Sequence, residues 1–165
     1  MSTTHDSAPD TLAHIERVAE LLNDFAQQLE IRGMQHDASK LQEPEKSAFD
    51  RLKALSLSGM TYGSPEYREC LRKEEPAIQH HYSENSHHPE HYENGVNGMD
   101  LLDLIEMLCD WKAASERMQG GGDIIRSIGV NTERFKLSPQ LVEIFQNTAL
   151  RHGWLDSTPP KGGAK

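Results

Sequence analysis

The 165-residue chain has little cysteine, few cationic side chains and no long apolar segment. Its two cysteines, Cys70 and Cys109, form neither the framework of a secreted disulfide-rich domain nor the paired motif of a thiolate zinc site. Seventeen Lys and Arg stand against 26 Asp and Glu, and the resulting net charge of −9 disfavours binding to a nucleic-acid polymer. No window approaches the ~20 apolar residues of a membrane span. These absences predict a cytoplasmic protein that binds neither a membrane nor a nucleic-acid polymer.

The apolar residues recur at spacings of three or four, and no segment of useful length alternates like a β-strand. We therefore predict an all-α fold, a single-domain helical bundle over residues 10–155 between flexible tails at 1–9 and 156–165. The first helix is expected to start at the N-cap Asp10 and to end at Gly33. Pro76 is expected to kink or break the helix at residues 66–82. The predicted helices cover residues 10–31, a short segment around 36–40, 45–55, 66–82, 100–118 and 139–152, with irregular segments at 56–65 and 83–98.

Histidine is the unusual part of the composition. Seven of the nine histidines lie between His14 and His91, and five of them fall within twelve residues. The series runs from His14 through the adjacent pair His36 and Asp37 to a histidine-rich turn at residues 80–91, and it ends at Asp110. Neutral imidazole and carboxylate are ligands for divalent Mn, Fe, Ni, Co or Zn. The pattern predicts a site for one or two divalent transition metal ions.

The two outer members of this series lie on predicted helices. His14 shares a face with the apolar residues of its helix, and Asp110 lies in a helix that is apolar over most of its circumference. A buried carboxylate is costly unless it is paired or coordinated. Each residue also has a simpler interpretation: His14 as a hydrogen-bonded core histidine, and Asp110 as the partner of Lys112 or Arg117.

The order of these residues resembles the HD superfamily of metal-dependent phosphohydrolases, an all-helical bundle named after its His-Asp pair. The run HDASK at residues 36–40, the segment HHYSENSHHPEHY at 80–92 and the segment DLIEMLCDW at 103–111 are similar to an HD-like family frequent in phage and bacterial genomes. The resemblance covers residues 10–148. If the chain is phage-encoded, its expected location is the cytoplasm of the host.

The resemblance implies a ligand set. His36, Asp37 and Asp110 would bind a first metal, with His14 as the first histidine of the series. Two further ligands are expected from the histidine-rich turn, and our choices there are His81 and His88.

The choice within the turn rests on limited periodicity. His81 follows Ile78 by three residues, towards the inner face of its helix, whereas His80 is placed to lean outward. No periodicity separates His87 from His88, and His91 also stays open. Two-metal members of the superfamily usually carry these histidines on two separate helices, so the number of ions stays open as well. The simplest alternative is a solvated polar loop.

A metal with an open coordination position activates water for hydrolysis of a phosphate ester. Asp37 would then serve catalysis, and Lys40, one turn later, is expected to bind the phosphate unless it is merely solvated. Glu45 is expected to orient or deprotonate the water. Asn85 and His80 are the other predicted substrate-binding residues.

The resulting hypothesis is a metal-dependent phosphohydrolase that acts on a small phosphorylated substrate, a nucleotide or another phosphomonoester. No base-reading motif identifies the substrate, and a homo-oligomer stays open. The same resemblance also admits an HD-type dinuclear-iron oxygenase. A third hypothesis is a binding module without turnover, in which the metal only ties the helices together.

Overall fold

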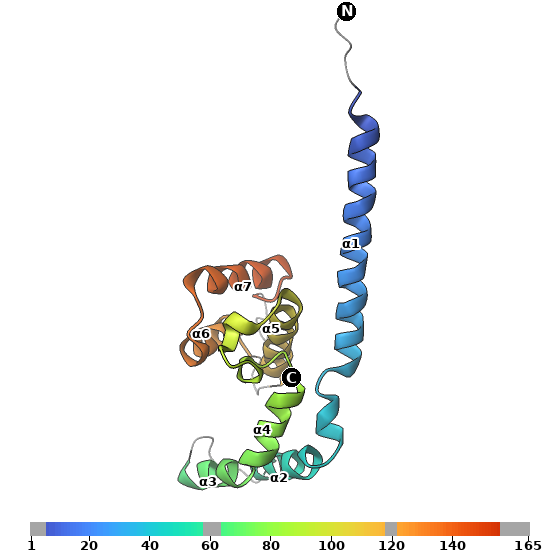
Figure 1. Ribbon diagram of the computed structural model, residues 1–165. Coiled ribbons are helices and arrows are strands. Elements are labelled where there is room, and N and C mark those ends of the chain that lie inside the picture. The colour runs from blue at the N-terminus through green and yellow to red at the C-terminus, as the bar shows by residue number, and fades with distance from the viewer. Residues whose placement is uncertain (1–5, 58–63, 118–121, 156–165) are drawn as a thin grey trace, which may run out of the picture. The chain divides into compact units, whose positions relative to one another are not determined.

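The computed structural model describes residues 6–57, 64–117 and 122–155 (Figure 1). These residues form seven α-helices and three short 3-10 helices without a β-strand, which confirms the predicted all-α class. The chain divides into two compact units, residues 1–36 and 37–165. The sequence had predicted one domain over residues 10–155, with no division at this boundary. None of the described helices is both long and apolar enough to cross a lipid bilayer.

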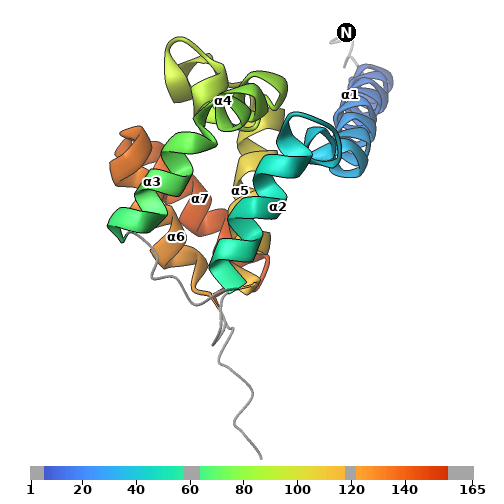
Figure 2. The same ribbon diagram turned by 90° about the horizontal axis from the view of Figure 1, so that it is seen from below.

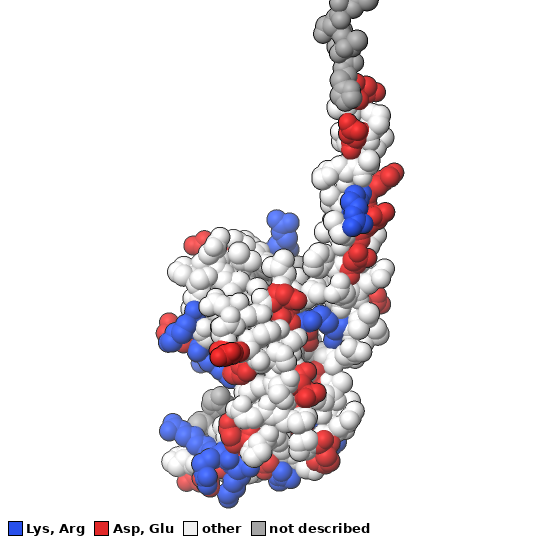
Figure 3. All heavy atoms as spheres, viewed as in Figure 1, with Lys and Arg blue, Asp and Glu red and all other residues white. Residues whose placement is uncertain are grey.

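The described part of the first unit is one helix, α1 (Ala8–Gln35). Ser7, not Asp10, is its N-cap, because Pro9 occupies the first turn, where a missing backbone N–H costs nothing. The helix also continues past Gly33, so the predicted end was too early. None of its residues is buried. Figure 3 shows acidic side chains along its length. In the sequence the helix carries five Asp and Glu against two arginines.

The second unit begins with η1 (Ala38–Leu41), α2 (Glu45–Leu57), α3 (Pro65–Lys73) and α4 (Glu75–Glu84). The predicted short helix around 36–40 is only a 3-10 turn. The predicted break at Pro76 is confirmed, since Glu74 separates α3 from α4. Of the predicted loop at 56–65, the first two residues belong to α2, and residues 58–63 lie outside the described part of the chain.

The second half of this unit contains η2 (Pro89–His91), η3 (Gly95–Gly98), α5 (Leu101–Glu116), α6 (Ile124–Phe135) and α7 (Pro139–Arg151). Asp100 caps α5 and Ser138 caps α7, close to the predicted starts. The predicted helix that corresponds to α5 ended at residue 118, which lies outside the described residues. Helix α6 was not predicted, because Gly129 and several β-branched residues lower its intrinsic helix propensity.

Helices α5, α6 and α7 pack together around the main hydrophobic core (Figure 1 and Figure 2). Trp111 of α5 lies at its centre, with ring centroids 6.3 Å from Phe135 and 5.8 Å from Phe145. The buried members are Met107, Leu108, Trp111, Ile124, Ile128, Leu137, Phe145 and Ala149. This core fixes α5, whose Asp103 and Glu106 contact the segment from Ser86 to Tyr92 described below.

Replacement of Ile128 by alanine is expected to destabilise the protein by about 2–5 kcal/mol, because Ile128 is fully buried and the vacated volume cannot close completely. Val130→Ala on the same helix is the matched control, since Val130 is 62% exposed and should change stability by about 0.5 kcal/mol or less. Urea unfolding measures both. Equal effects of the two variants would contradict the assignment of the core.

Candidate metal centre

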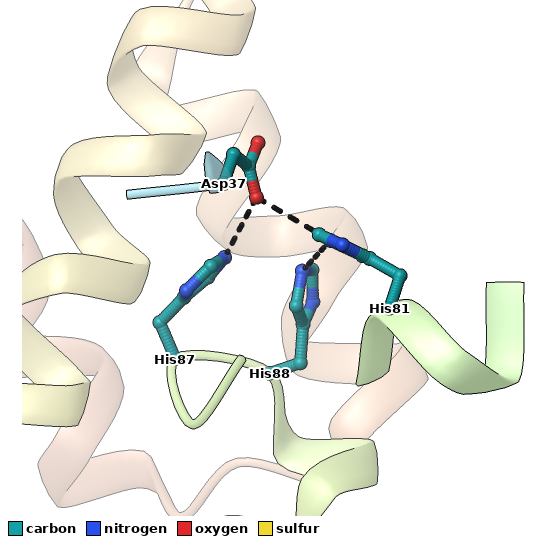
Figure 4. A group of neighbouring side chains, drawn as sticks. All are labelled: Asp37, His81, His87 and His88. Atoms are coloured by element: carbon teal, nitrogen blue, oxygen red, sulfur yellow. Dashed lines mark hydrogen bonds and ion pairs between the residues drawn. The ribbon is translucent and has the colours of Figure 1, made fainter. Parts of the chain in front are cut away.

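Four side chains of the second unit converge on one point: Asp37, His81, His87 and His88 (Figure 4). Each offers one ligand atom, and these atoms lie within 4.8 Å of one another. Asp37 Oδ1 is 3.4 Å from His81 Nε2 and 3.7 Å from His87 Nε2. His81 Nε2 is 2.9 Å from His88 Nε2. The four atoms therefore surround a point that a single metal ion can occupy.

The Asp37 side chain is aimed by an unusual backbone conformation. Its φ of 57° lies in the left-handed region, which aspartate tolerates better than most residues. Its carbonyl oxygen accepts from the Lys40 N–H at 2.9 Å and so begins η1. Lys40 Nζ lies 2.6 Å from Asp37 Oδ2. One carboxylate oxygen thus faces the imidazoles, and the other faces a cation.

His81 is held from behind by Glu45, a fully buried residue at the start of α2. His81 Nδ1 lies 2.8 Å from Glu45 Oε2, which also accepts from Ser39 Oγ at 2.9 Å. Burial raises the pKa of Glu45, but hydrogen bonds from His80, Ser39 and His81 outweigh burial, and the net pKa is lowered. An ionised Glu45 fixes the proton of His81 on Nδ1 and leaves the Nε2 lone pair directed at Asp37.

His87 has the same arrangement with a different carboxylate. Its Nδ1 lies 3.1 Å from Glu106 Oε1 of α5, and its Nε2 faces Asp37. A carboxylate behind each ligand histidine is the usual way in which proteins fix the tautomer of a metal-binding imidazole. Two such pairs aimed at one carboxylate oxygen are the main evidence that the residues fit a metal.

The environment favours the neutral imidazoles that metal binding requires. Burial, together with the neighbouring His87 and His81, lowers the pKa of His88 to about 3, against the opposing effect of Asp110 and Asp37. Burial and the charge of Lys40 also lower the pKa of His81. Both rings are therefore neutral at pH 7.

The structure brings together three of the predicted ligands, Asp37, His81 and His88, and adds His87, which the sequence left open. Asp110 is half-buried on α5, and it offers a carboxylate oxygen within 4.8 Å of one from Asp37. His14 and His36 belong to the first unit, where His14 is exposed on α1 and not buried as its helix face suggested. Their roles as ligands stay predictions.

The other predicted site residues surround this group. His80 leans outward as expected, with its side chain 42% exposed and its Nδ1 2.8 Å from Glu45 Oε1. Asn85 Nδ2 donates to Ser39 Oγ at 2.8 Å and to the His81 carbonyl oxygen at 2.8 Å. His91 is exposed, and its Nδ1 donates to the Tyr82 carbonyl oxygen. Glu106 was not among the predicted site residues, although its position four residues before Asp110 places both on one face of α5.

The donor set is three imidazole nitrogens and one carboxylate oxygen, which suits Mn, Fe, Co, Ni or Zn. Four protein ligands complete the tetrahedral shell of structural zinc. The same four ligands leave two positions open on a six-coordinate ion. The identity of the metal therefore decides whether this centre can bind water and a substrate.

Loss of a ligand should weaken metal binding. We expect His88→Ala to lower the affinity for Co²⁺ or Mn²⁺ by about 100-fold or more, because even outer partners of ligands are worth about 10–100-fold. The matched control is His91→Ala in the same turn, which should bind like wild type. Calorimetric titration of the metal-free proteins measures both, and equal affinities for the His88 and His91 variants would count against the site.

Loss of the orienting carboxylate should have a smaller effect. Glu45→Gln keeps the volume but removes the charge that fixes His80 and His81, and we expect the metal affinity to fall about 10–100-fold. The exposed Glu43→Gln change, two residues earlier, serves as the control. An unchanged affinity in a folded Glu45→Gln protein would show that the tautomer of His81 does not depend on Glu45.

Comparison with known proteins gives a family but no activity. No curated protein and no solved structure matches the chain. One family, described as a family of unknown function (DUF5662), matches residues 3–151, a span that contains every residue of the candidate metal centre. The chain therefore belongs to the family of unknown function DUF5662.

Proposed function

We propose that the protein is a metal-dependent phosphohydrolase, which uses a metal-activated water to release phosphate from a nucleotide or another small phosphomonoester. The observation that carries the proposal is the convergence of three imidazoles and Asp37, with the Lys40 ammonium on the far oxygen of the same carboxylate. The resemblance of the sequence to the HD superfamily supports the same reaction class.

Asp37, His81, His87 and His88 would hold the metal. When bound, a divalent ion lowers the pKa of a coordinated water towards ~7 and polarises a phosphoryl oxygen. The chain contributes three fixed imidazoles, and the Asp37 carboxylate balances part of the positive charge of the ion. Glu45 and Glu106 keep His81 and His87 in the tautomer that binds.

Lys40 is the residue that we assign to the phosphate. Its ammonium is 2.6 Å from Asp37 Oδ2 and 4.9 Å from the centre of the Phe49 ring, while its side chain is 33% exposed. An incoming phosphate can therefore reach it, and the net charge of −9 makes a local cation valuable for capture of an anion.

Glu45 takes a different role from the predicted base. Both of its oxygens accept from histidines, and the residue is fully buried, so it orients His80 and His81 in this proposal. Asn85 similarly supports Ser39 behind the metal centre. Of the other two predicted substrate-binding residues, Asn85 and His80, His80 has the exposed edge that a substrate can contact.

A metal-stabilised binding module is the second candidate function. The observation that favours it is the number of donors, since four protein ligands leave no open position on tetrahedral zinc. The oxygenase hypothesis requires two iron ions and consumption of oxygen. These three functions therefore differ in metal, stoichiometry and co-substrate.

The test begins with elemental analysis of protein purified without added metal. The metal-free protein is then loaded separately with Mn, Fe, Co, Ni or Zn, and each form is assayed for phosphate release from a nucleotide panel and from p-nitrophenyl phosphate. The proposal predicts turnover with at least one six-coordinate metal and little with zinc. Stoichiometric metal without phosphate release from any substrate would favour the binding module, and oxygen consumption by the iron form would favour the oxygenase.

The role of Lys40 gives a specific prediction for this assay. Lys40→Met keeps most of the aliphatic stem and removes the ammonium, so we expect metal content to be retained and kcat/KM to fall. The loss should correspond to a charged hydrogen bond of roughly 1.5–3 kcal/mol, about 10–150-fold. The control is Lys46→Met, which removes an exposed lysine paired with Asp50. If the metal-loaded Lys40→Met protein turns over as fast as the control, Lys40 is only a solvated side chain.

A further inference from the structure

Two of the four candidate ligands, His87 and His88, lie between α4 and η2, outside any helix. A metal site of this kind needs its ligands held within about 0.5 Å of their bound positions, and irregular backbone does not provide that by itself. Some other group must fix the backbone on both sides of these two histidines.

The Asp103 carboxylate contacts both ends of the segment. Ser86 Oγ, directly before His87, donates to Asp103 Oδ1 at 2.7 Å. The Tyr92 hydroxyl, four residues after His88, donates to Asp103 Oδ2 at 2.6 Å. Asp103 is 2% exposed, so these hydrogen bonds do not compete with bulk water. Burial and the bond to Asp103 raise the pKa of Tyr92 to about 12, which keeps its hydroxyl protonated as a donor.

The carboxylate is itself rigidly placed. Asp100 and Asp103 form a reciprocal capping box, in which the Asp100 N–H donates to Asp103 Oδ2 at 3.0 Å and the Asp103 N–H donates to Asp100 Oδ1 at 2.9 Å. The same helix carries Met107 and Leu108 into the hydrophobic core. The position of Asp103 is therefore set by the packing of α5.

Helix α5 also supplies Glu106, which lies behind His87. One helix thus holds the backbone of the turn through Asp103 and one of its imidazole rings through Glu106. The two contacts come from positions three residues apart, on neighbouring points of one helix face.

We propose that Asp103 is a positioning residue of the metal centre, which fixes the segment from Ser86 to Tyr92 so that His87 and His88 are already placed when the metal binds. This inference rests on the metal centre of the proposed function and not on hydrolysis. Without Asp103, the turn must become ordered at the moment of binding, and that cost appears as lost metal affinity.

The experiment compares two ways of removing the same contacts. Asp103→Ala removes the carboxylate, and the double change Ser86→Ala with Tyr92→Phe removes both donors while leaving the capping box of α5 intact. Asp100→Ala is the matched control, because it removes the cap of the same helix but leaves Asp103 bonded to Ser86 and Tyr92. Each metal-free protein is titrated with Co²⁺, and its visible absorption spectrum reports the coordination geometry.

We expect both the Asp103 variant and the double variant to bind Co²⁺ about tenfold or more weakly than wild type and to show an altered spectrum. Asp100→Ala should lower the unfolding midpoint without changing either readout. Wild-type affinity and spectrum in the double variant would overturn the inference, as would an equal loss in the Asp100 variant. If Asp103→Ala does not fold, the double variant decides.

The two proposals fail in different ways. Expected Co²⁺ results together with no phosphate release would leave Asp103 as a positioning residue and would reject only the phosphohydrolase. Phosphate release by wild type together with unchanged Co²⁺ binding by the double variant would support the phosphohydrolase and would reject the positioning role of Asp103. A wild-type protein that binds none of Mn, Fe, Co, Ni or Zn would overturn both.

Discussion

The convergence of His81, His87 and His88 around Asp37 is the constraint on which the candidate metal centre depends. Bringing these rings out of water is costly, and it lowers the pKa of both His81 and His88. Glu45 and Glu106 offset part of that cost by holding the outer nitrogens of His81 and His87. The inner nitrogens face Asp37 at distances a bridging cation can span. Folding therefore builds an arrangement whose chemistry suits a metal ion.

The fold was readable where local signals agree. Regular apolar spacing and Asp, Ser or Pro at the starts predicted α1, α2, α5 and α7, and Pro76 predicted the division between α3 and α4. Helix α6 was not predicted, because its residues have weak intrinsic helix propensity. It is stabilised instead by burial of Ile124 and Ile128 in a core shared with other helices. The unit boundary after His36 has no local signal, since α1 leads into η1 without a linker sequence.

Some residues of the candidate site could likewise be predicted from local signals, and others could not. His81 lies on a helix, so its periodicity indicated the inner face, whereas His87 and His88 lie in a turn whose backbone has no repeat to distinguish them. The supporting carboxylates could not be assigned, because Glu45, Asp103 and Glu106 act through contacts with segments remote in the sequence. Ligand types were thus visible in the sequence, and the groups that orient them became visible only in three dimensions.

Anomalous X-ray diffraction from crystals of the Co²⁺-loaded protein, measured on both sides of the cobalt absorption edge, tests the central claim most directly. The account predicts an anomalous peak about 2.0–2.2 Å from a carboxylate oxygen of Asp37 and from the Nε2 atoms of His81, His87 and His88. A peak bound elsewhere, or crystals with stoichiometric cobalt and no peak among these four residues, would contradict it.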